Sequence, residues 1–455
     1  VDYSITQPRF SFNIDTTGLW FGDRVVTSSI EGGYGLFAGR LPRVYFGNAF
    51  SRTNVDSDYV YNIGQFGPSA GPIPNLSTGA VTGITDPRFF WTRSSQSDYV
   101  YGQNGYRLYA YTHFTDPNFE GPSTYKSNIA LNLQFANGYD VRFEYNKDSV
   151  NKALIWKDLS YSEEGTLADG RALLDQRENP YLTNTGEGGG EAFSIIATKA
   201  FDNGVNLYAG YTNMEMEDAS RVASAQADSA YNKQPHDLAG ENLRAAPSDF
   251  MVDDKLIIGL DYTTQIFGTN DTRFSVLANR KSGRRYSLVY ETGDSEDSIT
   301  DGNWEAYDLI YVPTGVNDPN VVFASDAVAS SVMNFLNSGC AAGFSGQIMT
   351  RNACKGDYAT RVDLRITQDF QVNDDQKIVI YFDIQNLINF LDDDKGWQTE
   401  IDTNSVSRAV SVDLDQTTDS GQLYITGVNE DAGLIYSTDY GQSQWQMNLG
   451  ISYKF

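Results

Sequence analysis

The sequence predicts an all-β fold in which antiparallel strands cross a membrane and close into a barrel. Many segments alternate apolar and polar residues, as a strand with one apolar and one polar face does. The last segment alternates almost perfectly, with apolar positions at Trp445, Met447, Leu449, Ile451, Tyr453 and Phe455. About ten such residues span hydrocarbon along a tilted path. No stretch approaches the roughly 18 consecutive apolar residues of a spanning helix, so strands must make the crossing.

Short turns join alternating runs into hairpins. Asn137 and Gly138 separate two such runs, and Asn-Gly in this position is the strongest short hairpin signal. The predicted pairs are 10–14 with 23–37, 129–135 with 139–145, 193–197 with 205–211, 256–262 with 274–278, and 362–366 with 378–384. The last two pairs are expected to turn at 268–271 and 373–375. Together with the terminal strand, they make eleven spanning strands.

Long polar stretches alternate with these short turns, at about 38–122, 151–189, 217–252, 284–358 and 391–442. Outer-membrane barrels keep short turns on the periplasmic side and long loops outside, so the alternation assigns the two sides. With eleven antiparallel strands, the first and the last run in the same direction. Closure of the sheet needs edge strands that run in opposite directions. Either the count of eleven is off by one, or the chain is the C-terminal part of a larger barrel that contains an odd number of further strands, and we favour the second.

Composition narrows the range of partners. The formal charge of −26 makes nucleic acid a poor partner, because its binding depends on Lys and Arg that neutralise phosphates. An acidic surface either keeps long loops solvated or favours cations. Aromatic residues are 13% of the chain, which suits girdles at the two membrane interfaces. No composition break or linker divides the 455 residues, so we expect one architecture throughout.

Several motifs carry a resemblance to a known family. They are PRFSFN at 8–13, GGYGLFAGR at 32–40, YVPTG at 311–315, NDPNV at 317–321, GQI at 346–348 with RN at 351–352, RVDLR at 361–365, and YFDIQNLIN at 381–389. In this order they resemble the barrel of TonB-dependent outer-membrane receptors, in the Oar-like (OmpA-related) branch. The terminal aromatic Phe455 after an alternating strand resembles the signal that the barrel-assembly machinery reads in outer-membrane barrels.

The resemblance implies an integral outer-membrane protein surrounded by lipid and lipopolysaccharide. Its barrel would have about 22 strands, filled by an N-terminal plug and driven by the TonB complex. Residues 1–455 would then be the C-terminal part of that barrel, without the plug, the segment that contacts TonB or the first half of the strands. Val1 follows no signal peptide, so we expect the chain to begin at a mature or truncated start.

Charged residues on the spanning strands are predicted to face the lumen, because a charge facing lipid at the midplane costs several kcal/mol. The residues placed there are Arg361, Asp363, Arg365, Tyr381, Asp383 and Gln385. Two roles stay open for them: docking of the plug through salt bridges, and contact with the substrate. A separate basic group, Arg280, Arg284 and Arg285, lies where a strand emerges outside. It is a candidate contact for an anionic ligand or for lipopolysaccharide phosphates.

Cys340 and Cys354 lie in the longest late loop and are predicted to form a disulfide, which is stable in an oxidising compartment. Two free thiols are the alternative. Acidic clusters at Asp392, Asp393 and Asp394, and at 294–301, supply the oxygens that Ca²⁺ prefers. Neither cluster follows the EF-hand spacing, and a solvated loop is the competing interpretation. No cofactor is required.

Enzyme chemistry is not predicted. His113 and His236 are the only histidines, and no Ser-His-Asp order or HExxH pattern surrounds them. Two functions remain: a TonB-dependent receptor that takes up a ligand across the outer membrane, and a surface barrel whose loops serve adhesion, phage attachment or protein export. An upstream plug would favour the first. The substrate is not specified by the sequence, because specificity resides in the loops and the plug.

Overall fold

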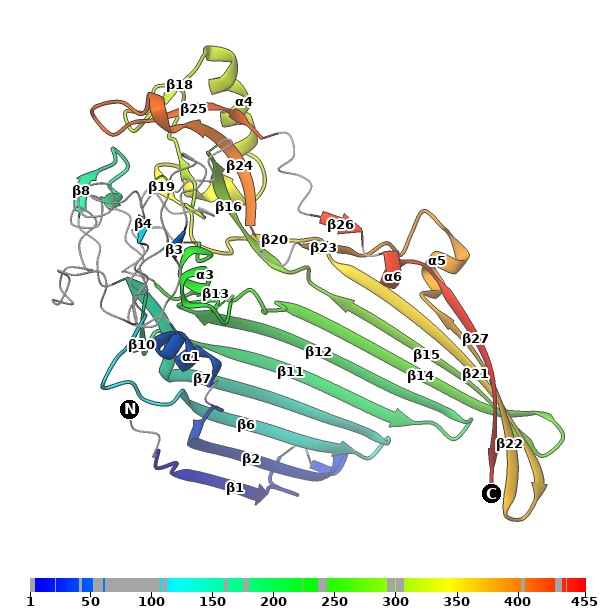
Figure 1. Ribbon diagram of the computed structural model, residues 1–455. Helices are drawn as coiled ribbons and strands as arrows, with labels where there is room; N and C mark the ends of the chain where they lie inside the picture. The colour runs from blue at the N-terminus through cyan, green and yellow to red at the C-terminus, as the bar shows by residue number, and fades with distance from the viewer. Residues whose placement is uncertain are drawn as a thin grey trace.

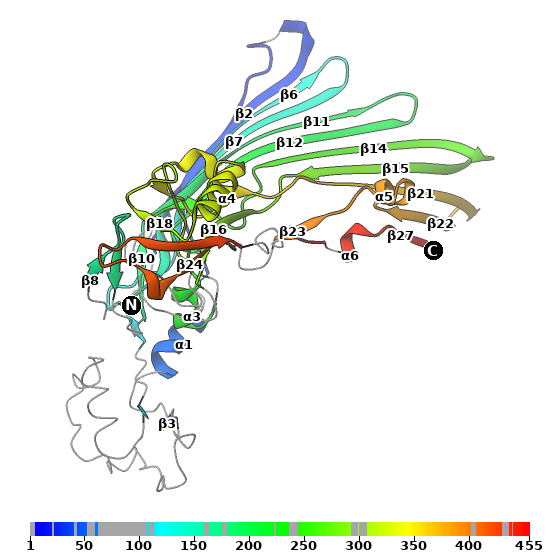
Figure 2. The same ribbon diagram turned by 90° about the horizontal axis from the view of Figure 1, so that it is seen from above.

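The computed structural model describes residues 5–20, 22–40, 43–51, 60–61, 107–108, 113–158, 163–174, 180–222, 224–235, 244–292, 299, 307–401, 406–429, 436–438 and 440–455. Its main feature is one large antiparallel sheet, in which eleven long strands follow one another in chain order (Figure 1). The predicted all-β fold class and the number of long strands are therefore confirmed. The sheet is curved rather than flat, as the view from above shows (Figure 2).

The eleven strands are joined in antiparallel register throughout. They are β1 (Arg9–Asp15), β2 (Val25–Ala38), β6 (Ser123–Phe135), β7 (Tyr139–Asp158), β11 (Gly188–Ala200), β12 (Val205–Asp218), β14 (Asp254–Phe267), β15 (Asn270–Lys281), β21 (Ala359–Asn373), β22 (Gln376–Gln385) and β27 (Gln446–Lys454). Within the described ranges, β1 pairs only with β2, and β27 pairs only with β22. Both outer edges of the sheet are thus open, and their strands run in the same direction.

The hairpin turns are as short as the sequence indicates. Gly138 and Gly204 have positive φ values of 81° and 84°, which residues with a Cβ rarely adopt. At Gly204 a Cβ would also meet the carbonyl oxygen of Thr263. Two turns are tighter than predicted. The turn expected over 373–375 is shorter by one residue, because β21 includes Asn373. The expectation of a turn over 268–271 is wrong at its second half, because β15 already begins at Asn270 and only Gly268 and Thr269 connect the strands.

Cross-strand register gives the sheet one continuous apolar face. A single row of paired positions runs Leu207, Leu260, Val276, Leu364, Ile384 and Met447 across six strands. Large apolar side chains on this face remain exposed, with Leu449 at 76% and Ile451 at 72%. The alternate positions form the opposite, polar face, because successive side chains on a strand point to opposite sides. A row on that face runs Asn206, Asp261, Ser275, Arg365, Asp383 and Asn448.

Aromatic rings border the apolar face at both ends of the strands. Near the short turns, Tyr139 packs edge-on against Phe201, and the Lys199 ammonium lies 4.2 Å from the centre of the Tyr139 ring. At the other end, the hydroxyl of Tyr358, which directly precedes β21, donates to Asp254 over 2.9 Å. Tyrosine at such a border keeps its ring in apolar surroundings and its hydroxyl with polar partners.

The two late polar stretches do not form simple loops, contrary to the sequence-based expectation. They fold into a five-stranded sheet of β18 (Val321–Phe323), β25 (Leu423–Val428), β24 (Val406–Asp413), β16 (Arg285–Glu291) and β20 (Cys354–Lys355), covered by α4 (Asp326–Leu336). We call this unit the external module. It lies at the ends of the long strands opposite the hairpin turns (Figure 1 and Figure 2). Its core includes Tyr290, Ile310, Leu336, Val410 and Ile425, all nearly inaccessible to solvent.

An early loop contributes to the same core. The hairpin of β8 (Glu163–Thr166) and β9 (Ala172–Leu174) contributes Leu167 to it, and nearby Arg171 is fully buried. The Arg171 guanidinium pairs with Asp169 at 2.5 Å and donates to the carbonyl oxygen of Leu309 over 2.8 Å. Burial raises the pKa of neighbouring Tyr290 to about 12, so its hydroxyl stays protonated. The external module therefore unites segments from three loops.

The remaining elements are short. The strands are β3 (Val60–Tyr61), β4 (Arg107–Leu108), β5 (Phe114–Thr115), β10 (Pro180–Thr185), β13 (Ala246–Pro247), β17 (Tyr311–Val312), β19 (Gln347–Ile348), β23 (Thr399–Ile401) and β26 (Tyr436–Thr438). The helices are α1 (Val44–Ser51), α3 (Ala227–Asn232), α5 (Leu387–Leu391) and α6 (Tyr440–Ser443). In the part of the chain that the structure describes, no helix is long and apolar enough to cross a membrane.

Cys340 and Cys354 form a disulfide in the external module, with a Cα–Cα distance of 5.2 Å and a sequence separation of 14. We expect the protein isolated from its native membrane to resist alkylation at both positions until it is reduced. By the chain-entropy model, closing a loop of this size adds about 3 kcal/mol to the stability of the module. Intact mass after alkylation, with and without reduction, checks the bond. Two alkylated thiols in the unreduced protein would contradict it.

Candidate functional site on the polar face of the sheet

The six residues predicted to face the lumen share the polar face of β21 and β22. Register pairs Arg365 with Asp383, and the two side chains form a bidentate ion pair with N–O distances of 2.5 and 2.7 Å. Arg361 donates to Asp363 over 2.8 Å and to Gln385 over 3.1 Å. Their placement on one face follows from the period of two, and their pairing follows from the register between the strands.

Tyr381 completes this group in an unusual position. Its ring lies over Gly450, the residue opposite it on β27, where any added Cβ would collide with the ring. The Arg365 guanidinium lies 5.3 Å from the centre of the same ring, within the range of a cation–π contact. Gly450 is thus required by the aromatic side chain across the strand pair. The polar face here presents a ring flanked by charged groups.

A second cluster on the polar face was not singled out from the sequence. Arg142 on β7 makes a very short contact with Glu31 on β2, and it also donates to Glu144 over 2.9 Å and to Asn132 over 2.8 Å. The alternation of charged residues at 140–144 indicated which face they share. Nothing in the sequence indicated the partner Glu31, which lies 111 positions away.

A pocket of about 270 Å³ opens on the polar face, at the ends of β15 and β21 that adjoin the external module. Its wall contains Leu277, Asn279, Lys281, Ala359, Arg361, Asp363 and Gln398. Arg361 and Asp363 are paired with each other, whereas Lys281 has no ion pair within the described ranges. The Oδ1 atom of Asn279 is buried without a hydrogen-bond donor. The pocket therefore offers one unpaired cation and one unsatisfied acceptor.

The predicted basic group does not converge on one ligand. Arg280 lies on the apolar face of β15, opposite Leu256, and its guanidinium is 4.7 Å from the centre of the Tyr358 ring. Arg285 begins β16 and pairs with Asp253 at 2.9 Å. Arg284, the residue before β16, is half-buried. Two of the three arginines thus already have partners within the protein, on different elements.

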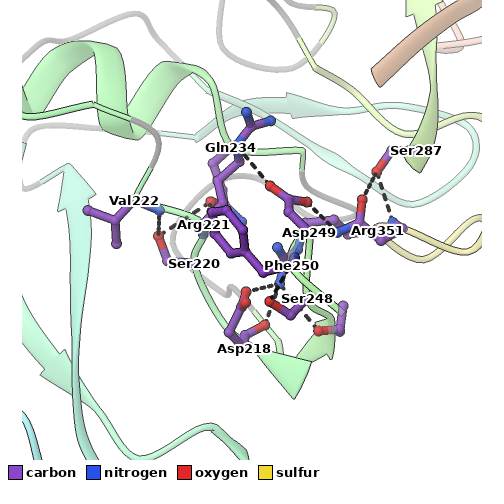
Figure 3. A network of polar contacts seen from close by, with 12 residues as sticks. Asp218, Ser220, Arg221, Val222, Gln234, Ser248, Asp249, Phe250, Ser287 and Arg351 are labelled. Atoms are coloured by element: carbon purple, nitrogen blue, oxygen red, sulfur yellow. Dashed lines mark hydrogen bonds and ion pairs between the residues drawn. The ribbon is translucent and has the colours of Figure 1, made fainter. Parts of the chain in front are cut away.

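A buried polar network fastens the external module to the end of β12 (Figure 3). Arg351 pairs with Asp218 at 2.5 Å. Asn352, at a left-handed φ of 57°, donates from its amide to Asp249 over 2.5 Å and to the carbonyl oxygen of Pro247 over 2.7 Å. Its backbone N–H donates to Ser287 over 2.9 Å. Since the network joins residues of the module to the rim of the sheet, it fixes the position of the module above the strands.

Arg221 extends the same network towards α3. Its Nε lies 3.3 Å from an oxygen of Asp249, and its backbone N–H donates to Gln234 over 3.0 Å. Burial lowers the pKa of the Arg221 guanidinium, and the Asp249 carboxylate opposes this shift. Buried charges of this kind are stable only when they are paired, so Asp249 is central to the network.

The three predicted calcium ligands lie after α5. Carboxylate oxygens of Asp392, Asp393 and Asp394 are all within 4.8 Å of one another. Lys395 already pairs with Asp392 at 2.6 Å, and this hydrogen bond lowers the pKa of the Asp392 carboxyl. The acidic residues predicted at 294–301, which are Asp294, Glu296, Asp297 and Asp301, all lie outside the described residues. His236 is also outside them, whereas His113 is buried beside β5.

Phe455 follows the last residue of β27 and is 93% exposed. Its ring centre lies 6.0 Å from that of Tyr453, on the same side of the strand. The aromatic terminus is therefore accessible at the end of the strand near the hairpin turns. Its role as an assembly signal stays a prediction.

No protein family model matches the chain, and no curated protein matches it. Several solved structures match the chain. BauA, the ferric preacinetobactin receptor from Acinetobacter baumannii, is 11% identical with a TM-score of 0.39, and the match covers 100% of this chain and 37% of that chain. The outer membrane transporter YddB from Escherichia coli is 12% identical with a TM-score of 0.41, covering 94% of this chain and 38% of that one.

A mutant of the ferric enterobactin receptor PfeA from Pseudomonas aeruginosa is 9% identical with a TM-score of 0.36, covering 84% of this chain and 34% of that chain. The chain thus spans little more than a third of the length of the structures it matches. At this level of likeness, the matches say nothing about the ligand of this chain.

The buried network predicts a charge-specific effect at Asn352. Asn352→Ala removes three side-chain hydrogen bonds, two donated to Asp249 and Pro247 and one accepted from Ser287, and is expected to cost about 1–3 kcal/mol of stability of the module. Asn352→Asp is expected to cost more at pH 7, because the new carboxylate would face the buried carboxylate of Asp249. Both carboxyl pKa values would be raised in the folded state, so the extra cost should disappear as the pH falls and the group protonates.

Resistance of the module to limited proteolysis, measured in urea at pH 7 and pH 5, checks this expectation. Asn334→Asp, on the exposed side of α4, is the matched control and should change little at either pH. An Asn352→Asp variant as stable as the parent protein at pH 7 would show that the network does not hold the module.

Proposed function

We propose that this chain is the C-terminal part of the barrel of a TonB-dependent outer-membrane receptor, which binds a ligand at its external end and passes it inward. The observation that carries the proposal is the division of one continuous eleven-stranded sheet into an exposed apolar face and a charged polar face. The motif resemblance given above supports the choice of receptor family. Uptake across the outer membrane is the corresponding function.

The apolar face supports the interpretation that the sheet lies in a lipid bilayer with this face toward the lipid. Exposed apolar patches of more than a few hundred Å² are rare on soluble monomers, and here a row of apolar side chains continues over six neighbouring strands, from Leu207 to Met447. Aromatic residues border it at both ends, as in the girdles of outer-membrane barrels. In hydrocarbon the open edges at β1 and β27 would have to be paired, which an odd number of additional strands would achieve.

The polar face supports the interpretation that it lines an enclosed lumen, which a plug fills. Charged groups on it are paired across strands, as Arg365 is with Asp383 and Arg142 with Glu31. The Arg365 side chain nevertheless remains 56% exposed, so it is free to contact a further surface. A plug that fills the lumen would supply such a surface, and we assign this role to the paired residues of β21 and β22.

We assign ligand contact to the pocket at the external end of the polar face. It lies at the ends of β15 and β21 that adjoin the external module, where a ligand entering from outside would first meet the barrel wall. Lys281 and Arg361 provide two cations against the single carboxylate of Asp363, and Asn279 provides an acceptor. A ligand with an acidic group and a neighbouring hydrogen-bond donor would match these groups.

The test of this function is the intact mass of the mature polypeptide that carries this sequence, extracted from native outer membrane. A polypeptide much larger than 50.5 kDa that also binds the purified periplasmic domain of TonB would support uptake. A polypeptide of this larger size without a plug or TonB binding would instead favour a surface barrel for adhesion, phage attachment or protein export. Absence of the polypeptide from the outer membrane would refute both.

If the apolar face lies in lipid, introducing a charge should cost much more stability at one residue of β15 than at its neighbour. Val276→Arg places a charge at the middle of the apolar face and should cost about 2–4 kcal/mol. Ser275→Arg places the same charge on the polar face beside Asp261 and should cost about 1 kcal/mol or less. Urea unfolding of the full-length protein in phospholipid vesicles measures both. Equal costs would place the apolar face outside lipid.

A further inference from the structure

Arg280 lies on the apolar face of the sheet, which contacts lipid if the chain functions as an outer-membrane barrel. The role assigned to Arg280 therefore rests on the proposed function. Register pairs Arg280 with Leu256 on β14 and with Thr360 on β21. The positions that precede it on the same face of β15, toward the hairpin turn, are Ala278, Val276 and Phe274, which belong to the apolar face. An exposed guanidinium therefore follows directly on the apolar face, at the end of the strand near the external module.

The height of Arg280 matches the outer boundary of a membrane. Arg280 lies ten residues beyond Asn270, where β15 leaves its hairpin turn. At about 3.3 Å per residue and a tilt of about 40°, this path rises roughly 25 Å, the height of the apolar band of outer-membrane barrels. A charge at that level costs little, because it reaches the zone of lipid headgroups.

A rigid aromatic support holds the guanidinium there. The Tyr358 ring centre lies 4.7 Å from Arg280 and 5.5 Å from the Lys355 ammonium. The Tyr358 hydroxyl donates to Asp254 over 2.9 Å, and the hydroxyl of Tyr211 donates to the other oxygen of Asp254 over 2.7 Å. Two tyrosines fixed by one carboxylate thus form a platform at the boundary of the apolar face.

The charges on this platform leave Arg280 without an acidic partner. Asp253 pairs with Arg285 at 2.9 Å and with Lys355 at 3.2 Å, and Asp254 accepts from the two tyrosines. Among the described residues, no carboxylate oxygen lies within 4.0 Å of the Arg280 guanidinium. A guanidinium at a membrane boundary that has no acidic partner in its own chain can pair with an anion from its surroundings.

We propose that Arg280, supported by Tyr358 and Lys355, binds the phosphate group of a lipid in the outer leaflet. A guanidinium pairs with phosphate oxygens through two parallel hydrogen bonds, and tyrosine rings beside it suit the depth of the headgroups. Inorganic phosphate in solution would meet the same charge but not the adjoining apolar face. The commitment to a lipid rests on the continuity of Arg280 with that face.

The neighbouring residue provides a matched control. Lys281 is the next residue of β15, is also exposed, and points to the opposite, polar face, where it borders the pocket. Loss of either residue removes one positive charge at the same height of the same strand. A difference between the two variants therefore reports the face on which the anion binds and not the net charge of the protein.

The experiment measures binding of bisphosphorylated lipid A to the full-length protein in detergent micelles by native mass spectrometry. Arg280→Gln should weaken binding about tenfold, as expected for the loss of one bidentate charge-assisted contact. Arg280→Lys should retain part of the affinity, and Lys281→Gln should retain all of it. Lipid A without phosphates should bind the parent protein as weakly as bisphosphorylated lipid A binds Arg280→Gln, and millimolar inorganic phosphate should not compete.

Equal affinity of Arg280→Gln and the parent protein would overturn the proposal, as would loss of binding in Lys281→Gln alone. Competition by inorganic phosphate would show an anion site that does not require lipid, and would also overturn it. These outcomes are distinct from failure of the proposed function. A protein that inserts in vesicles with the costs expected at positions 275 and 276 but ignores lipid A phosphates would refute only the site at Arg280.

Discussion

The structure depends on one constraint: the backbone N–H and C=O groups of each long strand pair with those of its neighbours in the sheet. Pairing over eleven consecutive strands fixes the register, and the register fixes the face to which every side chain points. A shift of β21 by one residue against its neighbours would bring Arg361, Asp363 and Arg365 onto the apolar face. The apolar face, the charged polar face and the open edges at β1 and β27 all follow from this one pattern of hydrogen bonds.

Most of the sheet could be predicted from the sequence, because the relevant information is local. Alternation over a few residues and an Asn-Gly turn specify a hairpin such as β6 and β7 without reference to the rest of the chain. The same period of two placed Arg361, Asp363 and Arg365 together on one face. It could not assign Arg142 to Glu31, because contact between residues 111 positions apart depends on which strands become neighbours.

The external module could not be predicted, for the same physical reason. Its core joins Leu167, Tyr290, Leu336, Val410 and Ile425 from segments that are far apart in sequence and polar on average. None of these segments has enough apolar residues for a core of its own, so each resembles a solvated loop when considered alone. Their assembly explains the buried pairs Arg171 with Asp169 and Arg351 with Asp218, since charges enclosed by such packing require partners.

Neighbouring residues at the outer end of β15 illustrate how the sheet separates two environments. Arg280 and Lys281 carry the same charge and differ by one step along the strand, yet one borders the apolar face and the other the pocket. A sequence-based grouping of Arg280 with Arg284 and Arg285 by proximity therefore combined residues that the fold separates. On a strand, parity decides which groups act together, and distance along the chain does not. The basic residues of this protein consequently serve several contacts, each defined by the face on which the residue lies.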